Sequence, residues 1–180
     1  MKLAAVLILV MLAMVPTSAA RADLLEATSA AVTVLPADES GLVKVAVRFD
    51  LSAVMEGDGR RIDDALLEWT VDSAPTADRP ARYAVREVLA SWDAARASSG
   101  EQAVTASENT VSDWSIGARS WSRVGGFVRL DVESLIADWL ADPQRNFGVL
   151  IEAKDVSRQA VANVLGQMKL IVRYGFIKAD

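Results

Sequence analysis

The chain has 180 residues, of which 52% are hydrophobic and 24% charged, and its formal net charge is −5. This length and composition suit one globular domain that can bury a core of its own. The absence of cysteine and histidine excludes disulfides, thiolate or imidazole catalysis, and zinc or copper sites built from those side chains. Carboxylate chemistry, hard-metal binding through oxygen, and binding without catalysis remain.

Residues 1–22 have the pattern of a secretory signal peptide. Lys2 precedes an apolar run from Leu3 to Val15, and the run is shorter than the roughly 20 residues of a membrane-spanning helix. The following Ala20-Arg21-Ala22 matches a small-residue cleavage site, so we expect the mature chain to begin at Asp23. Cleavage after Ala20 and an uncleaved anchor are the alternatives. The expected product is secreted, periplasmic or extracellular, with no transmembrane segment in the mature chain.

Loss of residues 1–22 leaves 17 basic residues against 24 acidic ones, a net charge of −7. We expect no nucleic-acid partner, because phosphate neutralisation needs a basic surface and no basic cluster is longer than Arg60-Arg61. The acidic residues between Glu56 and Asp64 lack the ordered alternation of a calcium loop and are typical of a solvated turn. The sequence therefore predicts no metal and no cofactor.

Apolar residues recur with a period of two along most of the expected mature chain, which indicates strands with one buried face. The turns between them are polar, as in Asp38-Glu39-Ser40-Gly41. About seven strands are typical of a β-sandwich, so residues 23–180 are predicted to form a single all-β domain. The clear strands are expected at Leu42–Asp50, Ala65–Asp72, Phe127–Val132, Phe147–Ala153 and Met168–Tyr174, and weaker ones at Ala31–Leu35 and Arg82–Leu89.

One segment has helical periodicity instead. Apolar residues from Val132 to Leu140 follow the spacing of a helix with one buried stripe, which predicts a single short helix near 132–141. Asp131 is the expected N-cap, and Asp142-Pro143 should end the helix. We expect the helix to plug an open end or edge of the sandwich, with Trp139 as its anchor.

The polar stretch from Asp93 to Asn109 shows little periodicity and is expected to be a long loop. Loops of this length are uncommon and are either functional or mobile. Both alternatives remain open from the sequence.

Three segments resemble motifs of a known family, in the same order and at about the same spacing. They are Val47–Ser52 (VRFDLS), Val128–Trp139 (VRLDVESLIADW) and Asn146–Ile151 (NFGVLI). The chain from Thr28 to Tyr174 thereby resembles the DNRLRE domain, which is disaggregatase-related and carbohydrate-binding-module-like. The resemblance implies an antiparallel jelly-roll-like β-sandwich in an extracellular setting. It departs from the family at Thr110–Trp114, where a following proline is missing.

The tryptophans are the candidates for ligand contact, because sugar rings stack on exposed aromatic side chains. The periodicity favours core packing for Trp69, Trp92 and Trp139. Trp114 and Trp121 are instead flanked by polar residues, and burial under a loop is the alternative for both.

Arg119 and Arg123 lie beside these two tryptophans in the sequence, and a guanidinium pairs with a uronate carboxylate in a two-point hydrogen bond. Trp114, Arg119, Trp121 and Arg123 are therefore the predicted ligand-binding residues, and no catalytic residue is predicted. The expected function is non-catalytic binding of a cell-surface or extracellular polysaccharide, preferably an acidic one. A structural envelope or matrix module acting through protein contacts is the alternative, and a polysaccharide-active enzyme ranks third.

Overall fold

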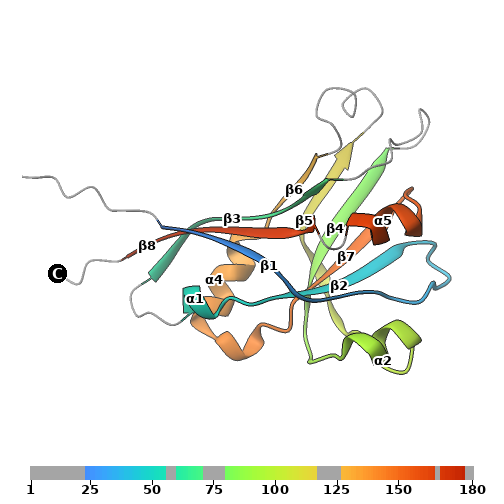
Figure 1. Cartoon of the computed structure of the whole chain (residues 1–180), viewed down its shortest axis with the longest axis horizontal. Helices are drawn as coiled ribbons and strands as arrows, with labels where there is room; N and C mark the ends of the chain where they lie inside the picture. The colour runs from blue at the N-terminus through green and yellow to red at the C-terminus, as the bar shows by residue number, and fades with distance from the viewer. Residues whose placement is uncertain (1–22, 56–59, 71–79, 117–126, 165–166, 177–180) are drawn as a thin grey trace, which may run out of the picture.

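The computed structural model describes residues 23–55, 60–70, 80–116, 127–164 and 167–176. In these ranges the chain forms eight strands and several short helices (Figure 1). The strands are β1 (Asp23–Val34), β2 (Val43–Phe49), β3 (Arg60–Thr70), β4 (Ala81–Val88), β5 (Ala106–Ile116), β6 (Phe127–Asp131), β7 (Val149–Lys154) and β8 (Lys169–Phe176). The helices are α1 (Ser52–Met55), α2 (Ala94–Ser99), α4 (Glu133–Ala141), α5 (Arg158–Val164) and the 3-10 helix η1 (Pro143–Arg145).

The strand pairing is that of a jelly roll. β4 pairs with β5, β3 with β6, β2 with β7 and β1 with β8, all antiparallel, so the chain is one long ribbon folded back on itself. The ribbon is wound so that β1-β8-β3-β6 and β2-β7-β4-β5 become the two sheets. The predicted all-β jelly-roll sandwich is confirmed.

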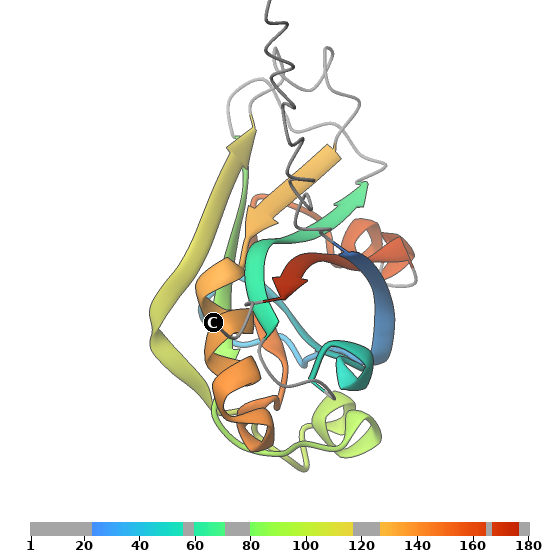
Figure 2. The same cartoon turned by 90° about the vertical axis from the view of Figure 1, so that its left-hand side faces the viewer.

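β1 belongs to both sheets. Its first half, Asp23–Thr28, pairs with β8, and its second half, Ser29–Val34, pairs with β2. The register shifts between Ser29 and Ala31, where an irregularity lets the strand bend from one sheet to the other. Figure 2 shows β1 curving around the side of the sandwich, while β5 and β6 are the outer strands on the other side.

The predicted alternation produces the core between the sheets. Val45, Val47 and Phe49 of β2 point inward, as do Leu67 and Trp69 of β3, and all are at most 3% exposed. Trp92 and Trp139 are also buried, so the prediction of core packing is confirmed for all three of these tryptophans. Core packing thus accounts for Trp69, Trp92 and Trp139 without any ligand.

The predicted helix is α4, and it lies at one end of the sandwich (Figures 1 and 2). Leu135, Ile136 and Trp139 form its buried stripe. The N-cap residue is Val132 and not Asp131 as predicted. The Asp131 carboxylate still accepts a hydrogen bond of 2.9 Å from the Glu133 N–H. Asp131 therefore satisfies one of the free N–H donors at the helix start, although it lies one residue before the N-cap.

α4 is accompanied by other short helices, so the expectation of one helix is wrong. The stretch Asp93–Asn109 is also not a loop throughout, because it contains α2 and the first residues of β5. Asp93 caps α2 by accepting from the Arg96 N–H, and Gly100 ends it at a φ of 83°. Such helices are too short to display a period of 3.6 residues, which is why the sequence pattern missed them.

α2 covers part of the outer face of the β2-β7-β4-β5 sheet. Its fully buried Ala97 packs in a second, smaller core with Ala46, Val88, Trp92 and Leu150. The Trp92 indole N–H donates to the Phe147 carbonyl at 2.8 Å, which satisfies its polar atom. Among the described residues, no other helix packs in this second core, and part of the outer face is left open there. None of the helices in the described ranges has the length and hydropathy to cross a membrane.

Candidate functional site

The open part of this outer face carries a hollow of about 230 Å³ above Ala84 of β4. Ala84 lies directly opposite Asp113 on β5 and Glu152 on β7. Directly paired residues point to the same side of a sheet, so the small methyl group lies between two longer acidic side chains. The hollow therefore follows from the register, which places alanine where its neighbours carry long chains.

Two cations border the hollow. Arg82 and Lys154 are directly opposite each other on β4 and β7, both are exposed, and both line the hollow. Neither forms an ion pair or a side-chain hydrogen bond within the part of the chain that the structure describes. Like charges directly opposite each other destabilise a sheet. The pair thus costs stability and leaves positive charge available to an anionic group.

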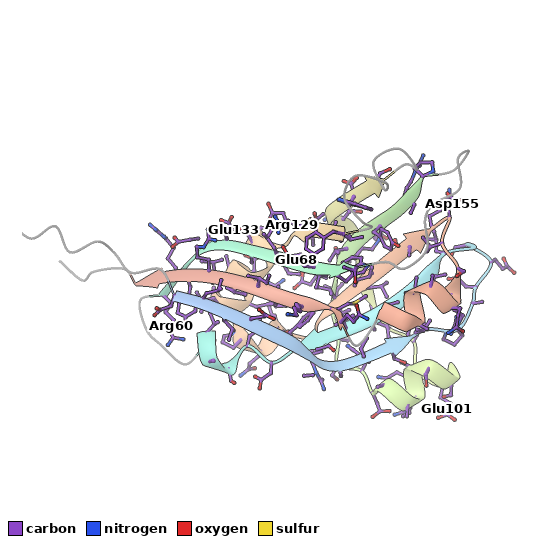
Figure 3. The ribbon with its side chains drawn as sticks, turned by 45° about the horizontal axis from the view of Figure 1, so that its top comes forward. Arg60, Glu68, Glu101, Arg129, Glu133 and Asp155 are labelled. Atoms are coloured by element: carbon purple, nitrogen blue, oxygen red, sulfur yellow. The ribbon has the colours of Figure 1, made fainter. Side chains whose placement is uncertain are left out.

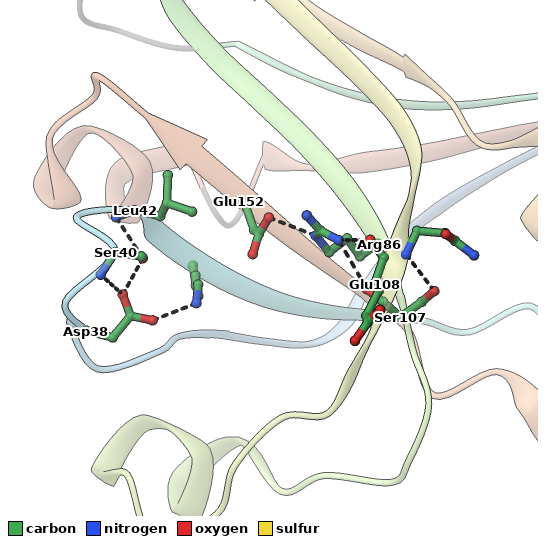
Figure 4. Close-up of polar contacts among 9 residues, drawn as sticks. Asp38, Ser40, Leu42, Arg86, Ser107, Glu108 and Glu152 are labelled. Atoms are coloured by element: carbon green, nitrogen blue, oxygen red, sulfur yellow. Dashed lines mark hydrogen bonds and ion pairs between the residues drawn. The ribbon is translucent and has the colours of Figure 1, made fainter.

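Other cations on this face have partners. Arg86 donates to Glu152 at 2.8 Å and also to the carbonyl oxygens of Ser107 and Glu108 (Figure 4). Lys44 forms an ion pair of 2.6 Å with Asp38. Arg82 and Lys154 are therefore distinguished from their neighbours by having no partner in the part of the chain that the structure describes, and not by charge alone.

The turn between β1 and β2 forms one wall of the hollow through Leu42. The Leu42 N–H donates to the Ser40 hydroxyl at 3.2 Å, and Ser40 in turn donates to the Asp38 carboxylate from both its hydroxyl and its N–H (Figure 4). The side-chain hydrogen bond from Lys44, followed by those from Ser40, lowers the pKa of Asp38 to about 2. Asp38 therefore stays ionised at ordinary pH, and the network orders the turn that carries Leu42.

Trp114 is one of the lining residues, and its position is at the edge of the sandwich. It is directly opposite Tyr83, and the two ring centroids are 5.9 Å apart. Tyr83 faces the core and meets Trp69 edge to face at 5.3 Å, and burial raises its pKa to about 12. The half-buried Trp114 ring thus lies on the inner side of β5, at the outer end of a row of three aromatic rings.

Arg119, Trp121 and Arg123 lie in 117–126, outside the described residues. That segment follows Ile116, whose neighbour Ser115 lines the hollow. Of the four predicted ligand-binding residues, the structure therefore describes only Trp114. The joint role of the four in ligand binding stays a prediction.

A second recess of about 450 Å³ lies where β5 approaches β6 and the start of α4. Asp113, Asp131 and Glu133 line it together with two serines. The described residues contain no group of three or more acidic side chains placed to hold a metal ion. We therefore assign no metal site to this recess.

The residues around Ala84 were missed by sequence reasoning, although part of their signal was present. The alternation in Arg82–Leu89 predicts that Arg82, Ala84 and Arg86 share a face. The sequence pattern could not predict how β4 and β7 are paired, because the two strands are separated by 60 residues. Only that register brings Lys154 opposite Arg82.

No protein-family model matches the chain, and no curated protein matches its sequence. The resemblance to the DNRLRE domain accordingly stays a prediction, and the candidate site depends on its own geometry.

Proposed function

We propose that the protein is a non-catalytic module that binds an acidic polysaccharide at the hollow above Ala84. The observation that carries this proposal is the pair of exposed cations, Arg82 and Lys154, that have no partner among the described residues and border an open recess. A carboxylate or sulfate group on the ligand would supply the missing counter-charge.

The other groups at the hollow suit a sugar ring. The Arg82 guanidinium can hold a carboxylate in two parallel hydrogen bonds. Asp113 and Glu152 offer carboxylate oxygens as acceptors for hydroxyl groups. Leu42 and Ala84 present apolar surface to the C–H face of the ring. The volume of about 230 Å³ is smaller than the roughly 300–1,000 Å³ of drug-sized pockets, so the hollow suits one unit of an open-ended chain.

The net charge of the expected mature chain opposes binding of a polyanion at long range. This repulsion is screened beyond about 8 Å at physiological salt, whereas the contact with Arg82 and Lys154 acts at shorter distance. Binding is therefore expected to tolerate moderate salt, although high salt weakens it.

The proposal also includes secretion, membership of a DNRLRE-like family, and a ligand contact that extends beyond the hollow. Residues 1–22 support secretion through their signal-like pattern, and the jelly-roll topology agrees with a DNRLRE-like module. Trp114, Arg119, Trp121 and Arg123 are proposed to extend the ligand contact along the edge of β5.

The test compares a uronic-acid polymer with the same polymer after chemical reduction of its carboxyl groups, using affinity gels and calorimetry. The double variant Arg82→Gln/Lys154→Gln should bind the acidic polymer at least about tenfold more weakly, because two charge-assisted contacts are lost. Ala84→Leu should fill the hollow with the same result. Arg173→Gln removes an exposed cation from the other sheet and should bind like the wild type.

Trp114→Ala and Trp121→Ala test the extension of the site, and each is expected to weaken binding if the variant keeps the wild-type melting temperature. Equal binding by all folded variants would reject the site. Failure of the wild type to bind any polysaccharide would reject the function and favour a structural module that acts through protein contacts.

A further inference from the structure

The opposite face of the sandwich has its own groove, of about 640 Å³, on the outer side of the β1-β8-β3-β6 sheet. Cross-strand register places Lys169, Glu68 and Arg129 in one row on β8, β3 and β6. Phe127 and Thr70 are opposite each other in the next row of β6 and β3. Figure 3 shows Glu68 and Arg129 side by side on this face.

The charged side chains of this groove neutralise one another. Arg129 forms an ion pair with Glu68, and Lys169 forms one with Glu26. Glu68 is 8% exposed, so a charged carboxylate lies at the bottom of an outward-facing groove with its countercharge beside it. In contrast to the hollow above Ala84, the described residues of this groove include no cation without a partner, so they offer no unpaired charge to a ligand.

The groove also combines apolar and hydrogen-bonding surface. Phe127 and Ile171 are half-buried and line it. The Arg129 guanidinium lies over the Phe127 ring, 5.3 Å from its centre, which leaves the other side of the ring for a ligand. The Thr70 hydroxyl donates to the Gln167 amide oxygen at 3.0 Å, which leaves the two N–H donors of that amide for another partner. The Glu68 carboxylate has further acceptor capacity beyond its bond to Arg129.

We propose that this groove is a second binding site, which takes an uncharged sugar ring stacked on Phe127 and hydrogen-bonded to Gln167 and Glu68. Its ligand differs from that of the first site because its charges are already paired. One stretch of a polysaccharide cannot lie on both outer faces at once, so a protein with both sites filled joins two chains. The second site goes beyond the proposed function and does not depend on binding at Ala84, whereas the joining of two chains rests on both sites.

The experiment titrates the protein with neutral oligosaccharides of glucose, mannose and xylose by calorimetry, in parallel with the uronic-acid polymer. The wild type should bind at least one neutral oligosaccharide. Phe127→Ala should weaken that binding about fivefold or more, and Gln167→Ala should weaken it as well. Leu24→Ala is the matched control, because Leu24 is 63% exposed and lies outside the groove. Melting temperatures confirm that each variant is folded.

A second readout tests the joining of two chains. Beads coated with the uronic-acid polymer should capture beads coated with the neutral polymer only when the wild-type protein is present. Either Phe127→Ala or Arg82→Gln/Lys154→Gln should abolish this capture, while each leaves the other site's ligand bound.

The two proposals fail separately. Absence of neutral binding with intact acidic binding overturns the second site alone, and the reverse result overturns the first alone. Neutral binding that is unchanged in both Phe127→Ala and Gln167→Ala overturns the placement in this groove. A loss of self-association or of peptide binding in Phe127→Ala, without any effect on sugars, also overturns it and identifies the groove as a protein contact.

Discussion

Gly148 occupies a position that requires glycine for two reasons. Its φ of 99° lies in the left-handed region, and a Cβ atom there would be 2.2 Å from the Val47 carbonyl oxygen. Its own carbonyl accepts a hydrogen bond of 3.0 Å from the Val88 N–H. The residue thus lets β7 begin in direct contact with β2 and β4, and β4 and β7 are two of the strands that line the hollow.

Gly148→Ala is therefore expected to destabilise the protein more than Gly41→Ala does. Gly41 has a φ of 67° and no atom within 4 Å of an added Cβ, so its substitution costs only the backbone strain, about 1 to 3 kcal/mol. Gly148→Ala adds a collision with the backbone of β2. Urea unfolding of both variants measures the difference, and equal free energies would show that β7 does not approach β2 as closely as described.

α4 shows how one element closes the end of the sandwich. Trp139 is fully buried and belongs to the main core, and its indole N–H has no hydrogen-bond partner among the described residues. The same core contains Phe49 of β2 and Leu170 of β8, which line a small void with Trp139. The helix is thus held by apolar packing against strands of both sheets.

Trp139→Ala is expected to lower the free energy of unfolding by about 3 to 5 kcal/mol, the usual cost of deleting a large buried aromatic side chain. Trp139→Phe should cost clearly less, because it keeps an aromatic ring and removes an N–H that has no partner. Thermal and urea unfolding measure both. An unchanged stability of Trp139→Ala would show that α4 is not docked on the core.

The whole molecule is organised around β1, which pairs with β8 in one sheet and with β2 in the other. Strands of both sheets also contribute to one continuous core. Neither sheet can therefore lose β1 without exposing part of the shared core. This arrangement predicts that the two sheets unfold as one cooperative unit.

Native-state hydrogen exchange tests that prediction. The slowest amides of β2 and β8 should exchange with the same free energy and the same denaturant dependence. Leu25→Ala removes apolar contact from the half of β1 that pairs with β8, yet it should reduce the protection of β2 and β8 equally. A loss confined to β8 and β3 would indicate that the sheets unfold separately.

The sequence by itself determined which residues face the core and what kind of fold they form. The alternation of Val45, Val47 and Phe49, and the helical stripe ending at Trp139, are local patterns that burial imposes within one element. They placed most strands and the main helix correctly. They revealed neither α2 nor any part of β5 (Ala106–Ile116). Ala97 is the only buried residue of that short helix and gives no period, and the polar β5 segment has no sustained alternation of apolar residues.

Only the tertiary structure decided which residues meet on the outer faces. Arg82 and Lys154 are 72 positions apart, and Glu68 and Arg129 are 61 positions apart. Outward residues bury little surface, so their pattern carries no information about how two strands are paired. The buried residues do fix the pairing, because a slip of one residue would turn every core side chain of the strand to the outer face. The core sets the register, and the register then fixes which charges are paired and which are left for a ligand.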